Sequence, residues 1–202
     1  MSSNISFNPL TTTNGLGSFS VQSDGYVQGV ALDDPAIRNA LAGGYLAAAE
    51  TLPMWGGVAI MENIPPSTSD GALGGAIQRA DTNAHITGFS VFNQAHNWVT
   101  SPQSQVPSAG AGMTVPFYRL GSGARIAVAI DPALVSLDGG LITQQVSWDL
   151  TNQKIIAYSG GIGALACKIL QINIGNSKTV TYDGVNNLVN WNNSGSCAII
   201  LI

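Results

Sequence analysis

The clearest alternation of hydrophobic and polar positions lies between residues 124 and 150. Ile126, Val128 and Ile130 fall on one side of an extended chain, and the residues between them fall on the other. A period of two is typical of a β-strand with one buried face. Asp131 and Pro132 then favour a single helical turn, with Asp131 as its cap.

A second strand of the same kind is expected after the Gly139-Gly140 pair, which ends that turn. Its buried face would contain Ile142, Val146, Trp148 and Leu150. Trp148 is therefore expected in the core. Residues 151–154 are expected to turn the chain into a return strand over residues 155–158.

Before residue 111, the pattern predicts strands over residues 25–32, 55–61 and 86–92. We expect two helices among them. One begins at Asp34 and Pro35 and is ended or interrupted by Gly43-Gly44, and a shorter one over residues 71–80 is capped by Asp70. Strands over 115–120 and 124–130 are expected to form a hairpin around residues 121–123.

The C-terminal part continues as strands and turns. Residues 170–174 alternate, residues 175–177 are expected to turn the chain back, and Val180 and Tyr182 lie on the return strand. A short strand follows over residues 188–191. The last run, CAIILI at 197–202, is apolar on both faces, which indicates a strand that is central in a sheet or covered by a partner.

These patterns predict a mainly β protein, an antiparallel β-sandwich or barrel with a few short helices. Residues 1–24 are assigned to an extended N-terminal arm and residues 25–202 to a single β-rich domain, with the most regular strands in 111–202. The arm has no charge before residue 24. Two interpretations fit it, an arm that packs on a partner and a free terminus. Residues 98–116 form a long Pro/Gly-containing loop, and such loops often contact partners.

Charge is scarce in this chain and restricts its partners. Charged residues make up 9% of the sequence, against about a quarter in a typical soluble domain, and the net charge is −4. The seven basic residues are dispersed, so the phosphate-neutralising clusters of nucleic-acid-binding proteins are missing, and the same dispersal argues against a membrane-surface role. The start, MSSNISFNPL, lacks the pattern of a signal peptide, so we expect synthesis in a cytoplasm.

No motif for catalysis, metal or cofactor binding is evident. His85 and His96 are the two histidines, and no G-x-S-x-G elbow accompanies them. Asp131 and Asp138 are better explained as turn residues than as a catalytic pair. Cys167 and Cys197 lie in apolar runs, where two buried free thiols are favoured over a disulfide. We therefore expect a non-enzymatic protein without catalytic residues, cofactor or metal.

Several stretches of the chain resemble structural proteins of tailed bacteriophages. They are LPMWGGVAIMENIP, ITGFSVFNQAHNWVTSPQSQVP, YRLGSGARIAVAIDPALVSLDGGLITQQVSWDLTNQKI, ALACKILQINIGNSKTVTYD and WNNSGSCAIILI. The similarity extends from about residue 52 to residue 202 and is weaker before it. The resemblance implies a virion component on the capsid exterior, a decoration (cement) protein that binds and stabilises the lattice of the major capsid protein.

The resemblance also implies how the protein would assemble. Its partners would be the major capsid protein and itself, as a homodimer or homotrimer, because a cement protein at a lattice junction usually shares the symmetry of the junction. The expected contact residues are Phe7, Leu10 and Phe19 in the arm, together with Trp98 and Val106 in the long loop. Two alternatives stay open. One is a receptor- or carbohydrate-binding module of the tail or baseplate, which needs exposed aromatics in a groove. The other is a small β-sandwich hydrolase, which needs a histidine, a carboxylate and a serine in one pocket.

Overall fold

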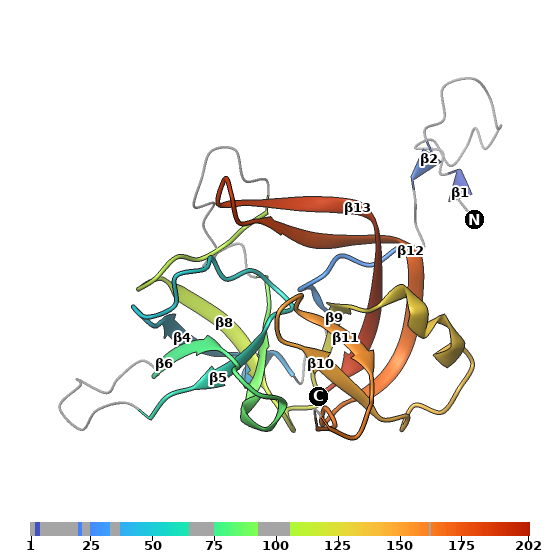
Figure 1. The fold of residues 1–202 in the computed structure, drawn as a ribbon, viewed down its shortest axis with the longest axis horizontal. Helices are drawn as coiled ribbons and strands as arrows, with labels where there is room; N and C mark the ends of the chain where they lie inside the picture. The colour runs from blue at the N-terminus through green and yellow to red at the C-terminus, as the bar shows by residue number, and fades with distance from the viewer. Residues whose placement is uncertain are drawn as a thin grey trace.

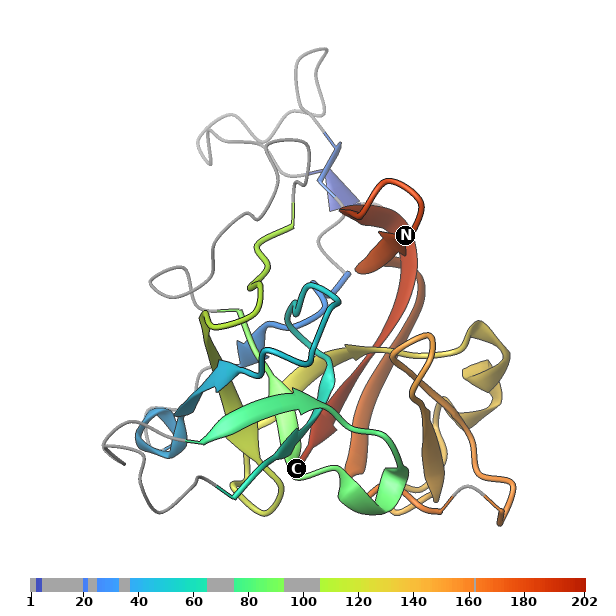
Figure 2. The same cartoon turned by 60° about the vertical axis from the view of Figure 1, so that its left-hand side comes forward.

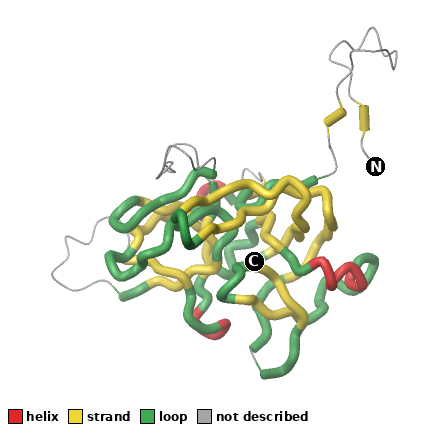
Figure 3. Tube along the Cα trace, turned by 45° about the horizontal axis from the view of Figure 1, so that its top comes forward, coloured by secondary structure: helices red, strands yellow, loops and turns green. Residues whose placement is uncertain are grey.

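The computed structural model describes residues 3–4, 20–21, 25–32, 37–64, 75–92, 106–161 and 163–202. In these residues β-strands dominate, and helix is limited to short 3₁₀ segments, as Figure 3 shows in red. The segments are η1 (Arg38–Ala40), η2 (Asn83–His85) and η3 (Pro132–Leu137). The structure thus confirms the prediction of a mainly β protein with a few short helices.

Five strands close into a barrel in the order β4-β6-β5-β7-β8 (Figure 1). Figure 2 brings this side of the molecule forward. The strands β4 and β6 run parallel, and the other neighbours are antiparallel. Their bounds are β4 (Ala42–Leu46), β5 (Ala59–Glu62), β6 (Ala76–Arg79), β7 (Gly88–Ser90) and β8 (Thr114–Arg119).

A four-stranded sheet with the order β12-β13-β9-β3 lies beside the barrel (Figure 1). Its strands are β3 (Ala31–Leu32), β9 (Arg125–Ala129), β12 (Lys168–Asp183) and β13 (Leu188–Leu201). The C-terminal apolar run pairs with β9 on one side and with β12 on the other. It is therefore a central strand, as its apolar character on both faces predicted.

Two further strand pairs complete the described part of the chain. The strands β10 (Val146–Asp149) and β11 (Lys154–Ala157) form an antiparallel hairpin, as predicted for this stretch. In the N-terminal arm, β1 (Ser3–Asn4) pairs with β2 (Ser20–Val21). The remaining residues up to Asp24 lie outside the described part of the chain.

Two apolar cores lie on opposite sides of the barrel wall. The first core contains Trp148 and lies between the outer side of the barrel, the four-stranded sheet and the β10–β11 hairpin. In it, the Phe89 ring packs edge-on against Trp148, with ring centroids 5.0 Å apart. The second fills the barrel with residues such as Leu46 and Phe117. Adjacent residues of β5 belong to different cores, because Ala59 packs into the first core and Ile60 into the second. Strands covered on both faces are apolar throughout, which is why β5 and β8 show little alternation.

Neither predicted α-helix is present in the described residues. Of the first, which was expected from Asp34 and was to be ended or interrupted by Gly43-Gly44, residues 38–40 form η1 and β4 begins at Ala42. Of the second, residues 76–79 form β6. The reason is visible at Gly44, where a Cβ would lie 2.7 Å from Cγ2 of Ile77 and 2.9 Å from the Gly75 carbonyl oxygen. The glycines therefore allow two barrel strands to approach closely, and tertiary pairing overrides local helix propensity.

Three turn and strand predictions also need correction. The strands β8 and β9 do not form a hairpin, because residues 120–124 carry the chain from the barrel to the other sheet. Residues 175–177 do not reverse the chain but form an irregularity inside β12, with Gly175 at φ 78° and a register shift against β13. Both strands change direction there (Figure 1). Finally, β10 begins at Val146, so Ile142 precedes it and is exposed.

Candidate functional site

Two hairpin loops with the same chemistry lie near a groove, and the first of them lines it. The sequences WDLTNQ (148–153) and YDGVNN (182–187) each place an aspartate at the end of a strand and an asparagine three residues later. In both loops the aspartate Oδ1 accepts the backbone N–H groups two and three residues ahead, and Oδ2 accepts the asparagine Nδ2. Gln153 and Asn187 then take positive φ angles of 52° and 53°. The loops are thus fixed by their own side chains.

The groove lies between the first of these loops, the end of β12 and the barrel. It has a volume of about 450 Å³. Its lining combines aromatic, aliphatic and neutral polar side chains with one arginine, and the residues are Leu52, Trp55, Arg79, Leu150, Thr151, Asn152, Gln153, Val180, Thr181 and Tyr182.

An aromatic and cationic stack forms one wall of the groove. The Tyr182 ring stacks on Trp55 with centroids 6.0 Å apart and an interplanar angle of 28°. The Arg79 Cζ atom lies 4.8 Å from the centroid of the Trp55 ring, within the range of a cation–π contact. Tyr182 also donates its hydroxyl to Asn187 Oδ1 at 2.8 Å, so the ring is held from both ends.

Arg79 is held by protein partners through both terminal nitrogens. Its Nη1 donates to Glu50 Oε1 at 3.2 Å and its Nη2 to the Pro53 carbonyl at 2.6 Å, while its backbone N–H donates to Glu50 Oε2. Both side chains of this ion pair are only 11% exposed. Burial lowers the pKa of the Arg79 guanidinium, and the Glu50 carboxylate opposes that shift. The charge of Arg79 is therefore neutralised inside the wall.

Trp55 carries an unused hydrogen-bond donor. The indole is 7% exposed, and its Nε1 is a buried side-chain nitrogen without a partner among the described residues. In its neighbour in the wall, Gln153, both polar atoms are hydrogen-bonded: Oε1 accepts from Ala59 N and Trp148 Nε1, and Nε2 donates to the Leu150 carbonyl. The unpaired indole N–H is thus an exception in an otherwise satisfied wall.

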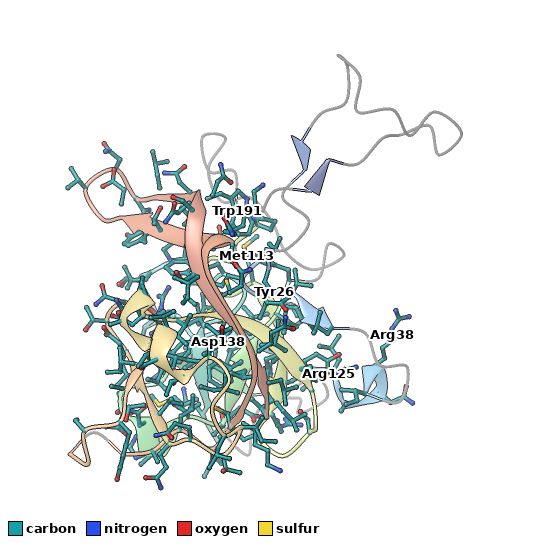
Figure 4. The ribbon with its side chains drawn as sticks, turned by 90° about the vertical axis from the view of Figure 1, so that its right-hand side faces the viewer. Tyr26, Arg38, Met113, Arg125, Asp138 and Trp191 are labelled. Carbon is teal, nitrogen blue, oxygen red and sulfur yellow. The ribbon has the colours of Figure 1, made fainter. Side chains whose placement is uncertain are left out.

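A second surface, which we call the apolar shelf, consists of Leu137, Leu141, Ile142, Tyr158 and Leu170. Leu141 is 77% exposed, and Ile142, Tyr158 and Leu170 are exposed too. Two hollows of about 370 and 140 Å³ share Leu137, Leu141 and Gln144 in their lining, so the apolar side chains of the shelf lie beside neutral polar ones. Asp138, labelled in Figure 4, is the one charged residue in the described lining of these hollows.

Single apolar side chains also project at loop ends. Val185 is 93% exposed at the tip of the β12–β13 hairpin, and Ile64 is 95% exposed after β5. Trp191, labelled in Figure 4, instead packs edge-on against another aromatic ring, that of Phe92, with ring centroids 5.6 Å apart.

Most of the contact residues expected from the sequence lie outside the described part of the chain. They are Phe7, Leu10, Phe19 and Trp98. Val106 is described and is fully buried in the second core, so its side chain is not at the surface of the single chain. Sequence reasoning missed the groove and the shelf, although the repeated D-x-x-N turn was a readable signal for the groove.

The titratable groups that the sequence singled out do not form one pocket in the described part of the chain. His85 Nδ1 lies 2.6 Å from Asp81 Oδ1, but both side chains are about 60% exposed. Asp131 caps η3 by accepting the Ala133 N–H and also pairs with Lys154 at 2.8 Å, as a turn residue would. Both cysteines are free thiols, and burial raises the pKa of each to about 12. His96 lies outside the described residues.

The described residues contain no group of three or more His, Cys, Asp or Glu side chains placed to hold a metal ion. They also contain no helix long and apolar enough to cross a membrane. Comparison with known proteins found no matching family model, no matching curated protein and no matching solved structure.

Proposed function

We propose that this protein is a non-enzymatic component of a bacteriophage virion that binds the outer surface of the capsid and stabilises the lattice of the major capsid protein. The observation that carries the proposal is the apolar shelf. Exposed apolar side chains that cluster on one surface with little charge beside them favour contact with another protein. The resemblance of residues 52–202 to phage structural proteins supplies the identity of the partner.

The chemistry of the chain agrees with such a role. A capsid-binding protein needs a rigid body and a surface that can be buried in neutral contacts, and only 9% of this sequence is charged. The shelf rests on η3, whose N-terminus is capped by Asp131 and whose Leu134 is buried, so it is presented on an ordered base. Binding that occurs only on the intact lattice would stabilise that lattice by mass action.

The test uses capsids that lack this protein. Purified wild-type protein is expected to co-sediment with them and to raise the temperature at which they release DNA. Leu141→Asp should abolish both effects, because it places a charge in the centre of the shelf. Val185→Asp is the matched control, since it adds the same charge at an isolated exposed valine and should bind normally.

Two results would overturn the proposal. One is failure of the wild-type protein to bind or protect the capsids. The other is normal binding by Leu141→Asp. The melting temperatures of both variants should equal that of the wild type, because both positions are exposed, and this measurement separates loss of binding from loss of folding.

A further inference from the structure

We propose that the groove lined by Trp55, Arg79, Tyr182 and the 150–153 loop binds a neutral saccharide. The groove shares no residue with the apolar shelf, so capsid attachment leaves it without a role. Its volume of about 450 Å³ lies in the range of small-ligand pockets. Figure 1 shows its two supports, the β10–β11 hairpin and the β12–β13 hairpin.

The lining matches the two kinds of surface that a sugar ring presents. A pyranose has apolar C–H faces, which pack on aromatic rings, and a rim of hydroxyls, which need neutral donors and acceptors. Tyr182 is partly exposed beside Trp55 and supplies aromatic surface. Thr151, Asn152 and Thr181 are exposed and supply hydroxyl and amide groups next to it.

The electrostatics of the groove select against charged ligands. Arg79 is the one charged residue in the described lining, and its guanidinium is held by Glu50 and Pro53. A phosphate or carboxylate would therefore have to compete with a buried ion pair, which costs more than a neutral ligand that leaves the pair intact. A nucleic acid strand brings such a charge with every nucleotide, so it is disfavoured for the same reason.

The groove is ordered before any ligand arrives. The Asp149 carboxylate fixes the loop that carries Thr151 and Asn152, so little ordering is needed on binding. The Trp55 ring lies beneath Tyr182 in the same wall, so a sugar that packs on Tyr182 would change the surroundings of the indole.

The repeated turn provides a closely matched pair of variants. Thr151 and Val185 occupy equivalent places, two residues after Asp149 and Asp183, and each donates its backbone N–H to the aspartate at 2.9 Å. Thr151 lines the groove, whereas Val185 does not. Thr151→Trp should therefore block the groove, while Val185→Trp adds the same side chain in the same turn geometry elsewhere.

The experiment screens the wild-type protein on a printed array of neutral and acidic oligosaccharides and titrates the strongest hit by calorimetry. We expect a neutral oligosaccharide to bind, Thr151→Trp to weaken that binding at least tenfold and Val185→Trp to leave it unchanged. In wild-type NMR spectra, the indole N–H signal of Trp55, assigned with Trp55→Phe, should shift on titration. Thr151→Trp should still bind capsids, so failure of one proposal is distinguishable from failure of the other.

Three outcomes would overturn the proposal: no neutral sugar binds, only acidic sugars bind, or Thr151→Trp binds as tightly as wild type. The third outcome, with no movement of the Trp55 signal, would place the sugar site elsewhere on the molecule.

Discussion

Buried side-chain amides act as backbone substitutes at several points in this molecule. Asn83 donates Nδ2 to the Trp148 carbonyl and accepts the Trp148 N–H on Oδ1, so it pairs with β10 as a neighbouring strand would. Gln28 accepts the Val180 N–H on Oε1, and Gln153 accepts the Ala59 N–H. Such amides satisfy backbone groups where sheets meet and regular pairing is impossible.

Gln153→Leu should be among the most damaging single substitutions. It keeps the volume but leaves the Ala59 N–H, the Trp148 Nε1–H and the Leu150 carbonyl without their buried partner, and unsatisfied buried groups cost about 1–3 kcal/mol each. We expect a loss of at least about 3 kcal/mol of unfolding free energy, measured by urea denaturation. Gln145→Leu, at the exposed residue just before β10, is the control and should change stability by less than about 0.5 kcal/mol.

At the scale of elements, the strands β4 and β6 approach each other closely in a region where the sequence predicted helices. Gly43→Ala and Gly44→Ala test this at adjacent residues of β4. A Cβ at Gly43 would meet nothing nearer than Thr114 Cγ2 at 3.8 Å, whereas one at Gly44 would overlap Ile77 and the Gly75 carbonyl. We expect Gly44→Ala to destabilise the protein by about 1–3 kcal/mol. Gly43→Ala should be neutral or slightly stabilising.

Thermal and urea unfolding of the two variants would measure this difference. Equal stability of the two would mean that β4 and β6 do not approach as described, and the contact of the two barrel strands would then have to be revised.

The elements that the sequence predicted correctly are those whose signal is local. The strand at 125–129, the capped turn at Asp131 and the β10–β11 hairpin need only alternation, a cap and a turn. The barrel strands β4 and β6 were missed because Ala- and Gly-rich runs have no clear period and acquire their state from distant partners. The groove was missed for the same reason, since it joins residues 52–55, 79, 150–153 and 180–182.

At the scale of the whole molecule, three turn-forming aspartates connect stability to pH. Hydrogen bonds from Lys154 and the Ala133 N–H hold the pKa of Asp131 below its usual value, and bonds from Asn186 and nearby backbone N–H groups do the same for Asp183. Burial alone would raise the pKa of Asp149, but bonds from Asn152 and Thr151 outweigh it and lower the pKa.

Acid should therefore destabilise the protein. A carboxyl group with a depressed folded pKa binds fewer protons in the folded state than in the unfolded state, so its contribution is present above about pH 4 and is lost as pH falls through the folded pKa. We expect the urea midpoint to be constant from pH 7 to 5 and to decrease between pH 4 and 2. Asp131→Asn should lower the midpoint at pH 7 and reduce the decrease, and a midpoint that did not change with acid would contradict this account.

The order of strands in the two sheets also has a kinetic consequence. β12 and β13 are neighbours in sequence, and so are β10 and β11, so these hairpins can form early by closing short loops. The strand β9, by contrast, pairs with β3 through Ala31 and Ile126 and also with β13, and β4 pairs with β8. The partners in each of these pairs are distant in the sequence. Both cores need these distant strand pairs to form. Refolding from urea should therefore take milliseconds to seconds rather than microseconds. During that interval the apolar C-terminal strand has a free edge, and refolding yield should decrease as protein concentration rises.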